Sequence, residues 1–115
     1  MKIEKFEDVI AWQKAKTLTL FVYGTFKSNK DFSFKNQIER AAVSVMNNIA
    51  EGFERRSEKE LVNFLYIAKG SCGEVRSMLH LAVELGYVTE SEFVFLESLS
   101  SEISRIISGF IKSVR

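Results

Sequence analysis

The sequence contains no proline and only six glycines among 115 residues, so it lacks the residues that most often interrupt helices. Long helices are therefore the first expectation. Apolar residues make up 46% of the chain, and this content disfavours disorder. At this length we expect a single domain, residues 1–115, that buries about two thirds of the surface exposed in the unfolded chain.

Cysteine and histidine are nearly absent. Cys72 is the only cysteine, which excludes an intrachain disulfide and favours the cytoplasm as the compartment. The charged N-terminal segment does not resemble a secretory signal, and no apolar run is long enough to span a membrane. His80 is the only histidine, which excludes the di-metal site of helical bundles because that site needs two Glu-x-x-His motifs.

Neither sign of charge dominates. The chain has 16 Lys and Arg residues against 15 Asp and Glu, a formal net charge of +1, so no overall field attracts nucleic acid or an anionic membrane. Phosphate-binding and dinucleotide-binding glycine motifs are missing from the sequence. Cys72 falls on an apolar helix face, where a thiol is inert. We therefore predict a protein that is not an enzyme and needs no metal or cofactor.

Apolar residues at spacings of three and four predict four helices. We expect them at about 6–26, 34–54, 58–85 and 90–112. Ser33 is the predicted cap of the second helix. Capping boxes at Ser57 with Glu60 and at Thr89 with Glu92 predict the starts of the third and fourth. Because short connections force neighbouring helices to run in opposite directions, the fold class is all-α, an antiparallel up-down-up-down four-helix bundle.

The first predicted helix is apolar on more than one side. Its main stripe consists of Ala11, Ala15, Leu18, Val22 and Phe26. Val9, Leu20 and Tyr23 point away from that stripe. A helix that is apolar nearly all round is usually buried on several sides, and in a chain this small a second copy must cover the extra side. This pattern predicts a homo-oligomer; the alternative is that the extra aromatic residues cap an irregular core.

A polar stripe accompanies the apolar one on the second helix, in the stretch QIERAAVSVMNNIAEG, and a matching stripe lies on the third helix. Glycine in a helix interior costs about 1 kcal/mol, so we expect a neighbour to pack closely at Gly70 and Gly73. The predicted polar network or subunit interface consists of Gln37, Arg40, Ser44, Asn48, Glu51, Ser71 and Glu74. In the alternative interpretation both stripes are solvated, and Glu51 pairs only with Arg55.

Three motifs carry a resemblance to a known family. The first comprises Phe6, Asp8, Trp12, Gln13 and Lys14; the second runs from Gln37 through Arg40, Ala41, Ala42, Ser44, Val45, Asn48, Ile49, Ala50 and Glu51 to Gly52; the third comprises Phe64, Leu65, Gly70, Ser71 and Glu74, followed by Leu85, Gly86 and Tyr87. With these motifs the chain resembles, over nearly its whole length, the four-helix-bundle proteins encoded by intervening sequences of 23S ribosomal RNA genes. The resemblance implies a ring, commonly a pentamer. It also implies a relation to the accessory proteins of diversity-generating retroelements, which bind nucleic acid and a reverse transcriptase through a basic surface.

Two functions remain open. The first is an oligomeric accessory protein that binds RNA or DNA through its phosphates. Its candidate contacts are Arg55, Arg56 and Lys59, with Lys14, Lys16, Lys27, Lys30 and Lys35. The second is a scaffold that docks a protein partner without binding nucleic acid. No membrane partner is expected for either.

Overall fold

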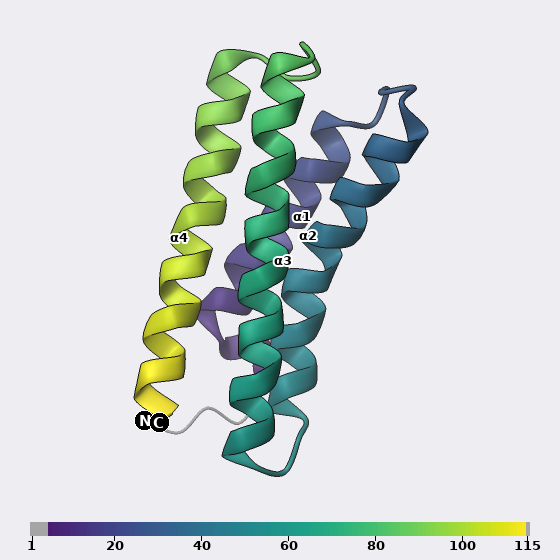
Figure 1. Cartoon of the computed structure of the whole chain (residues 1–115). Coiled ribbons are helices and arrows are strands. Elements are labelled where there is room, and N and C mark those ends of the chain that lie inside the picture. The colour runs from purple at the N-terminus through teal and green to yellow at the C-terminus, as the bar shows by residue number, and fades with distance from the viewer. Residues whose placement is uncertain (1–4, 115) are drawn as a thin grey trace.

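The computed structural model describes residues 5–114, which form a short 3₁₀ turn and four long helices. The turn η1 spans Phe6–Asp8, and the helices are α1 Ile10–Thr25, α2 Phe32–Phe53, α3 Glu58–Glu84 and α4 Glu90–Val114. The α1–α2 and α3–α4 connections lie at one end of the bundle and the α2–α3 connection at the other (Figure 1). Consecutive helices therefore run antiparallel, and the predicted all-α four-helix bundle is confirmed.

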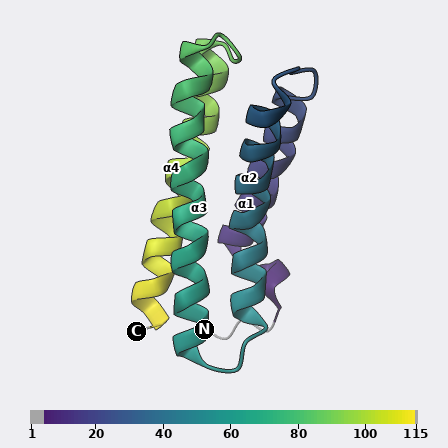
Figure 2. The same ribbon diagram turned by 45° about the vertical axis from the view of Figure 1, so that its right-hand side comes forward.

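The four helices pack in a closed cycle. Each helix contacts the one before and the one after it, and α1 closes the cycle against α4. Within residues 5–114 the diagonal pairs, α1 with α3 and α2 with α4, have no Cα atoms within 8 Å of each other, although the rings of Phe53 on α2 and Phe110 on α4 meet at 5.3 Å. Figure 2 shows this arrangement, with α2 and α3 in front of α1 and α4. The most extensive contact is that between α2 and α3, and the α1–α4 contact is the least extensive of the four.

The apolar stripes predicted from the sequence meet in one core. Its fully buried side chains are Ala11, Ala15, Leu18, Val22, Phe26, Ile38, Ala42, Val45, Ile49, Leu65, Ala68, Cys72, Val75, Leu79, Ala82, Ile103 and Ile107. Burying each larger side chain of this kind stabilises the fold by about 1.5–3 kcal/mol. The core therefore fixes the inward face of every helix and leaves the opposite faces free for function.

The first helix begins at Ile10 rather than at Phe6. Phe6–Asp8 form a 3₁₀ turn, and Val9 is extended, with φ −79° and ψ 122°. This turn directs Val9 into the core, where it is 2% exposed. The prediction that Val9 points outward is therefore wrong, because a helical period does not continue through an extended residue. Leu20 and Tyr23 are 65% and 46% exposed, as their outward placement on the helix predicts.

The start of α2 also differs from the prediction. Asp31 is the capping residue, because its Oδ1 accepts a hydrogen bond of 3.1 Å from the amide of Phe34. Ser33 already lies inside the helix, so its predicted capping role is wrong. Aspartate caps helices as well as serine does, so the residue type of Ser33 was not sufficient to place the cap.

The predicted starts of α3 and α4 and the predicted end of α3 are confirmed, whereas α4 continues to Val114, beyond the predicted end at Lys112. Ser57 Oγ accepts from the amide of Glu60 at 3.1 Å and starts α3. Thr89 and Glu92 bond reciprocally at 3.1 and 2.8 Å, which is the full capping box at the start of α4. Gly86 has a φ of 75°, the left-handed conformation that ends a helix.

Candidate functional site

The polar stripes of α2 and α3 face each other across the most extensive helix contact in the bundle. Ser44 Oγ and Ser71 Oγ lie 2.9 Å apart. Asn48 Nδ2 donates to the carbonyl and hydroxyl oxygens of Ser44 at 2.8 and 2.9 Å. Nearer the start of α2, Gln37 Nε2 donates to the Glu74 carboxylate. These side chains, here called the α2–α3 polar seam, set the register of the two helices.

Two residues of the predicted network lie outside this seam. Arg40 is exposed, and among residues 5–114 it has no hydrogen bond or ion pair with any seam residue. Glu51 is also exposed and forms an ion pair of 2.8 Å with Arg55, one helical turn away. The seam therefore consists of amides and hydroxyls with a single carboxylate, and it contains no buried charge pair. Hydroxyl and amide groups can be half-buried at little cost once they are hydrogen-bonded, whereas charges remain in water.

The close approach of α2 and α3 occurs at Gly52. A Cβ added there would lie 3.0 Å from Cβ of Phe64 and 3.1 Å from Cδ1 of Leu61. At Gly70 and Gly73, by contrast, an added Cβ would meet nothing within 4 Å. The expectation that these two glycines admit a neighbouring helix is therefore wrong within one chain. Their open surroundings leave room for contact with another molecule.

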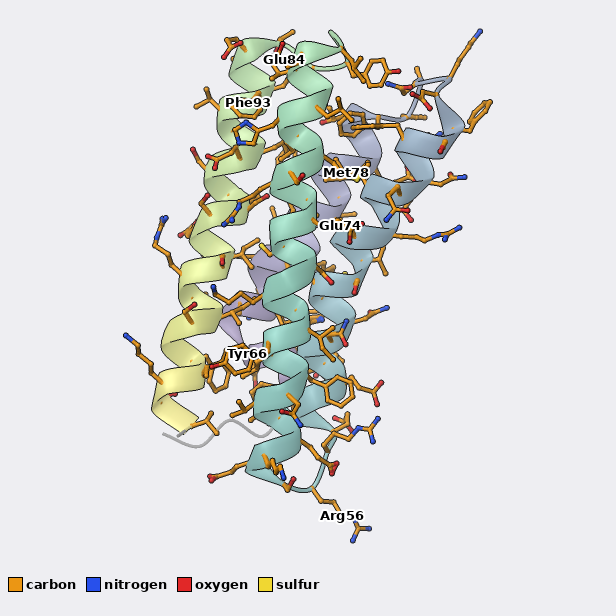
Figure 3. All side chains as sticks on the ribbon, in the orientation of Figure 1. Arg56, Tyr66, Glu74, Met78, Glu84 and Phe93 are labelled. Carbon is orange, nitrogen blue, oxygen red and sulfur yellow. The ribbon has the colours of Figure 1, made fainter. Side chains whose placement is uncertain are left out.

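The candidate nucleic-acid contacts do not gather in one patch. Arg56 and Lys59 are exposed at the α2–α3 connection, and Figure 3 shows Arg56 extending from that end. Acidic residues surround them: Glu54, Glu58 and Glu60. Arg55 lies over the ring of Phe64 at 4.8 Å while it pairs with Glu51.

The remaining candidate cations lie elsewhere. Lys14 pairs with Glu102 of α4 at 3.2 Å, and Lys16 is exposed with its Nζ 5.6 Å from the Trp12 ring. Lys27 and Lys30 lie in the α1–α2 connection and Lys35 in the first turn of α2, at the opposite end of the bundle from Arg56. A single chain thus presents its candidate cations in three separate places: the α2–α3 connection, the first half of α1, and the α1–α2 connection with the start of α2.

A contact that the sequence analysis did not anticipate joins the α1–α2 and α3–α4 connections. Tyr87 Oη donates to Asp31 Oδ2 at 2.7 Å, and the Tyr87 ring packs edge-on against Phe34 at 5.2 Å. The hydrogen bond from Tyr87, with that from the Phe34 amide, lowers the pKa of Asp31 below its ordinary value of 3.8. The same bond raises the pKa of Tyr87 above 10.0. Because the two residues are far apart in sequence, helical periodicity gave no signal for this pair.

Polar residues in the core were also not anticipated. Thr19 is 8% exposed, and its hydroxyl is within hydrogen-bond distance of two carbonyls, at 2.8 Å from Ala15 and 3.1 Å from Ala42. The second contact links α1 to α2. Ser100 is fully buried on α4, where its carbonyl accepts a hydrogen bond of 3.0 Å from the Cys72 thiol. Burial raises the pKa of that thiol to about 11, so Cys72 is not a nucleophile at neutral pH.

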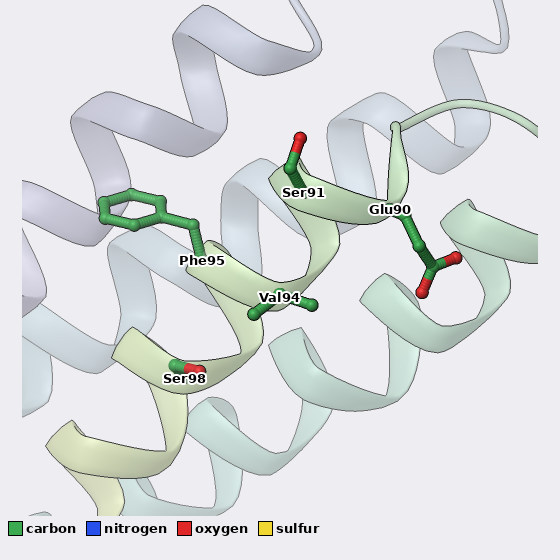
Figure 4. Close-up of a pocket in the computed structure, with 5 residues that line it drawn as sticks. All are labelled: Glu90, Ser91, Val94, Phe95 and Ser98. Carbon is green, nitrogen blue, oxygen red and sulfur yellow. The ribbon is translucent and has the colours of Figure 1, made fainter.

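The surface depressions are open and mainly apolar. One, of about 640 Å³, lies along the start of α4 and is lined by Glu90, Ser91, Val94, Phe95 and Ser98 (Figure 4). Phe95 extends from α4 toward α1, where its ring meets that of Phe21 at 4.8 Å. The surface of this depression is mainly apolar, so it offers few polar groups that could orient a small molecule. It is more suited to contact with another macromolecule than to small-molecule chemistry.

Within residues 5–114, no group of three or more His, Cys, Asp and Glu side chains is placed to hold a metal ion. In that same part of the chain, no helix combines the length and the apolar content needed to cross a bilayer.

Comparison with known families decides the relationship of this chain. The model of the family described as 23S rRNA-intervening sequence protein matches residues 7–109. The chain belongs to this family. The resemblance drawn from the three motifs is thereby confirmed. A comparison with curated proteins gave no match.

A solved structure supports the fold of this family member. It is a protein from Bacteroides thetaiotaomicron, described as having unknown function and belonging to the S23 ribosomal protein family. The two structures align with a TM-score of 0.84 and 24% sequence identity, over 90% of this chain and 99% of that chain. At this identity the likeness shows the four-helix fold alone.

Proposed function

We propose that this member of the 23S rRNA-intervening sequence family is a non-enzymatic homo-oligomer whose bundles assemble into a ring, with five as the expected subunit number. The observation that carries the proposal is the outward face of α1. Leu20 and Tyr23 are 65% and 46% exposed on a helix whose other face is fully buried. Apolar groups rimmed by polar residues are typical of interaction surfaces. A second copy of the chain would remove them from water.

Size-exclusion chromatography with light scattering at micromolar concentration tests the assembly. A ring of five would have about five times the 13.2 kDa mass of one chain. A particle with the mass of a single chain over the whole concentration range overturns the proposal.

Within such a ring, we propose a role as an accessory factor that binds RNA or DNA in the cytoplasm. The supporting feature is the pair of exposed cations at the α2–α3 connection, Arg56 and Lys59. Symmetry would repeat this pair on every subunit, so that weak contacts with phosphates add together. Glu54, Glu58 and Glu60 lie beside these cations and weaken the positive electrostatic potential of a single subunit. Binding therefore requires that several subunits present the pair together. No recognition motif is present, so we expect little dependence on base sequence.

Fluorescence anisotropy with a labelled RNA and a labelled DNA, measured across a range of salt concentrations, tests this role. We expect affinity to fall steeply as salt rises, and Arg56→Ala to weaken binding to both nucleic acids. Lys69→Ala, which removes one cation from the middle of α3, is the matched control and should bind like the wild type. Absence of binding at low salt overturns the nucleic-acid role while leaving the oligomer intact.

One observation favours a second candidate, a scaffold for a protein partner. Beside the contact between Phe21 and Phe95, the open depression on α4 exposes Val94 at 55%. This surface needs no positive charge to bind a partner. Affinity capture followed by nuclease treatment separates the two candidates. Recovery of one defined protein that resists nuclease supports the scaffold, and loss of all captured material on nuclease treatment supports the accessory factor.

A further inference from the structure

Two outward helix faces of opposite charge lie at opposite corners of the bundle. The first, the α1 ridge, consists of Lys16, Leu20, Tyr23 and Lys27, which recur at spacings of three and four and are all exposed. The second, the α3 ridge, consists of Ile67, Glu74, Leu81, Glu84 and Leu85, also all exposed. Each ridge places apolar side chains between charges of a single sign. This is the pattern of a surface that binds a partner of complementary charge.

The charge of the α1 ridge comes only from lysine. The segment Ile10–Thr25 contains no aspartate or glutamate, so no carboxylate of α1 itself neutralises Lys16. Two of the three cations of α3, Lys69 and Arg76, are half-buried on the side that faces α4. The third, exposed Lys59, follows the helical period of the ridge but lies about 12 Å before Ile67, at the α2–α3 end. Glu74 and Glu84 therefore set the sign of the α3 ridge. Both are exposed, and Figure 3 shows Glu74 on the side of α3 next to α2 and Glu84 near the end of α3.

The two ridges also match in length. At a rise of 1.5 Å per residue, Glu74 and Glu84 are separated by about 15 Å along α3. Lys16 lies about 14 Å before Thr25, the last residue of α1, and Lys27 lies in the turn that follows. Leu20 and Tyr23 lie between the lysines, as Leu81 lies between the glutamates. Gly70, on the same outward side of α3, has open space where a Cβ would be, so another helix can approach closely there.

We infer that the α1 ridge of one copy docks on the α3 ridge of the next copy. This inference rests on the proposed homo-oligomer and names the surfaces that build it. Because α1 and α3 lie diagonally across the bundle, with no Cα atoms within 8 Å of each other in residues 5–114, both ridges of one chain can be occupied at once. The contact joins two different surfaces, so it continues from copy to copy and closes into a ring when the rotation between neighbours allows it.

Reversal of charge on the full chain tests the contact. Lys16→Glu/Lys27→Glu makes both ridges acidic, and Glu74→Lys/Glu84→Lys makes both basic. We expect each double variant to raise the dissociation constant of the oligomer at least tenfold, with the mass measured by light scattering falling toward that of one chain. The variant with all four changes restores opposite charges at every contact, and its mass should return to that of the wild type.

Two controls and one uncharged ridge variant separate the ridge contact from other effects. Arg56→Glu/Lys112→Glu makes the same change in net charge at the α2–α3 end and should keep the wild-type mass. Gln37→Ala removes the hydrogen bond to Glu74 without changing charge, and this variant should also keep the wild-type mass. Leu20→Gln with Leu81→Gln replaces only exposed side chains, so the chain folds, and the oligomer should dissociate without any change in charge. Circular dichroism checks that every variant is helical.

The outcomes distinguish the inference from the proposal on which it rests. A wild-type protein with the mass of one chain overturns the proposed homo-oligomer itself. A wild-type oligomer whose double variants keep their mass overturns the ridge contact alone. So does a variant with four changes that stays dissociated, or a control that dissociates as readily as the ridge variants.

Discussion

The phenolic oxygen of Tyr87 lies 2.7 Å from Oδ2 of Asp31, and this hydrogen bond joins the α3–α4 connection to the first residue before α2. Asp31 at the same time caps α2 through its other carboxylate oxygen. One side chain thus holds the start of a helix and ties together the two connections at that end of the bundle. Elsewhere the helices are held mainly by apolar contacts.

Removing the hydroxyl group with Tyr87→Phe should lower the melting temperature at neutral pH, while the ring contact with Phe34 is retained. The pKa of Asp31 is lowered in the folded state, so the stability from this bond is present above pH 3.8 and is lost as pH falls through the lower, folded-state pKa. The pKa of Tyr87 is raised, so the contribution is also lost as pH rises beyond 10.0 through the folded-state value. Thermal unfolding of both proteins across pH measures this difference. A difference that stays constant through acid pH would contradict the assignment.

The α2–α3 polar seam should be sensitive to its central amide. Asn48→Ala removes both hydrogen bonds to Ser44 and should lower the free energy of unfolding by about 1 kcal/mol. Arg40→Ala, on the same helix but outside the seam, should stay within about 0.5 kcal/mol of the wild type. Urea unfolding at one protein concentration compares the two variants. Equal losses of unfolding free energy in the two variants would show that the hydrogen bonds of the seam add nothing specific to stability.

The close approach of α2 and α3 gives a test with two glycines. Gly52→Ala places a methyl group 3.0 Å from Cβ of Phe64, and such overpacking costs about 1–3 kcal/mol against a helix-propensity gain of about 1 kcal/mol. Gly109→Ala, within α4, meets nothing within 4 Å and should stabilise the chain by up to about 1 kcal/mol. In chemical unfolding, we therefore expect Gly52→Ala to lower the free energy of unfolding and Gly109→Ala to raise it. A stabilising Gly52→Ala would mean that the helices separate easily at this point.

The thiol of Cys72 should report on opening of the core. Because burial raises its pKa to about 11 and the side chain is fully buried, iodoacetamide should not label it in the native protein at mildly alkaline pH. Labelling should become complete in denaturant. Mass spectrometry after a timed reaction gives the modified fraction. Rapid labelling of the native protein would show that α3 and α4 part frequently near Ser100.

Helical periodicity was sufficient to predict the bundle. The apolar stripes of α2, α3 and α4 recur without interruption, so burial followed from spacing alone. Periodicity failed at Val9 because the chain leaves the helical conformation there and the side chain turns inward. The cap of α2 was predicted at Ser33 and lies at Asp31, because aspartate suits that position as well as serine and periodicity does not fix a helix end to the residue.

The candidate site was predicted in part. Small polar residues at the α2–α3 contact could be read from the sequence because they follow the helical period beside the apolar stripe. Which of them bond to one another depends on the axial register of two helices, and Arg40 and Glu51 differ from Asn48 only by a modest rotation about α2. The pair of Tyr87 and Asp31 depends on how two connections meet in space, which no local pattern records.

The seam between α2 and α3 has a consequence for how relatives are recognised. The stretch from Gln37 to Gly52 supplies Gln37, Ser44, Asn48 and the tight glycine contact, and each of these serves the internal packing of a single chain. A search of genomes with that stretch will therefore collect proteins that share a way of folding. The partners of those proteins are better compared through the outward residues of α1 and α3, where two chains with the same interior are free to diverge.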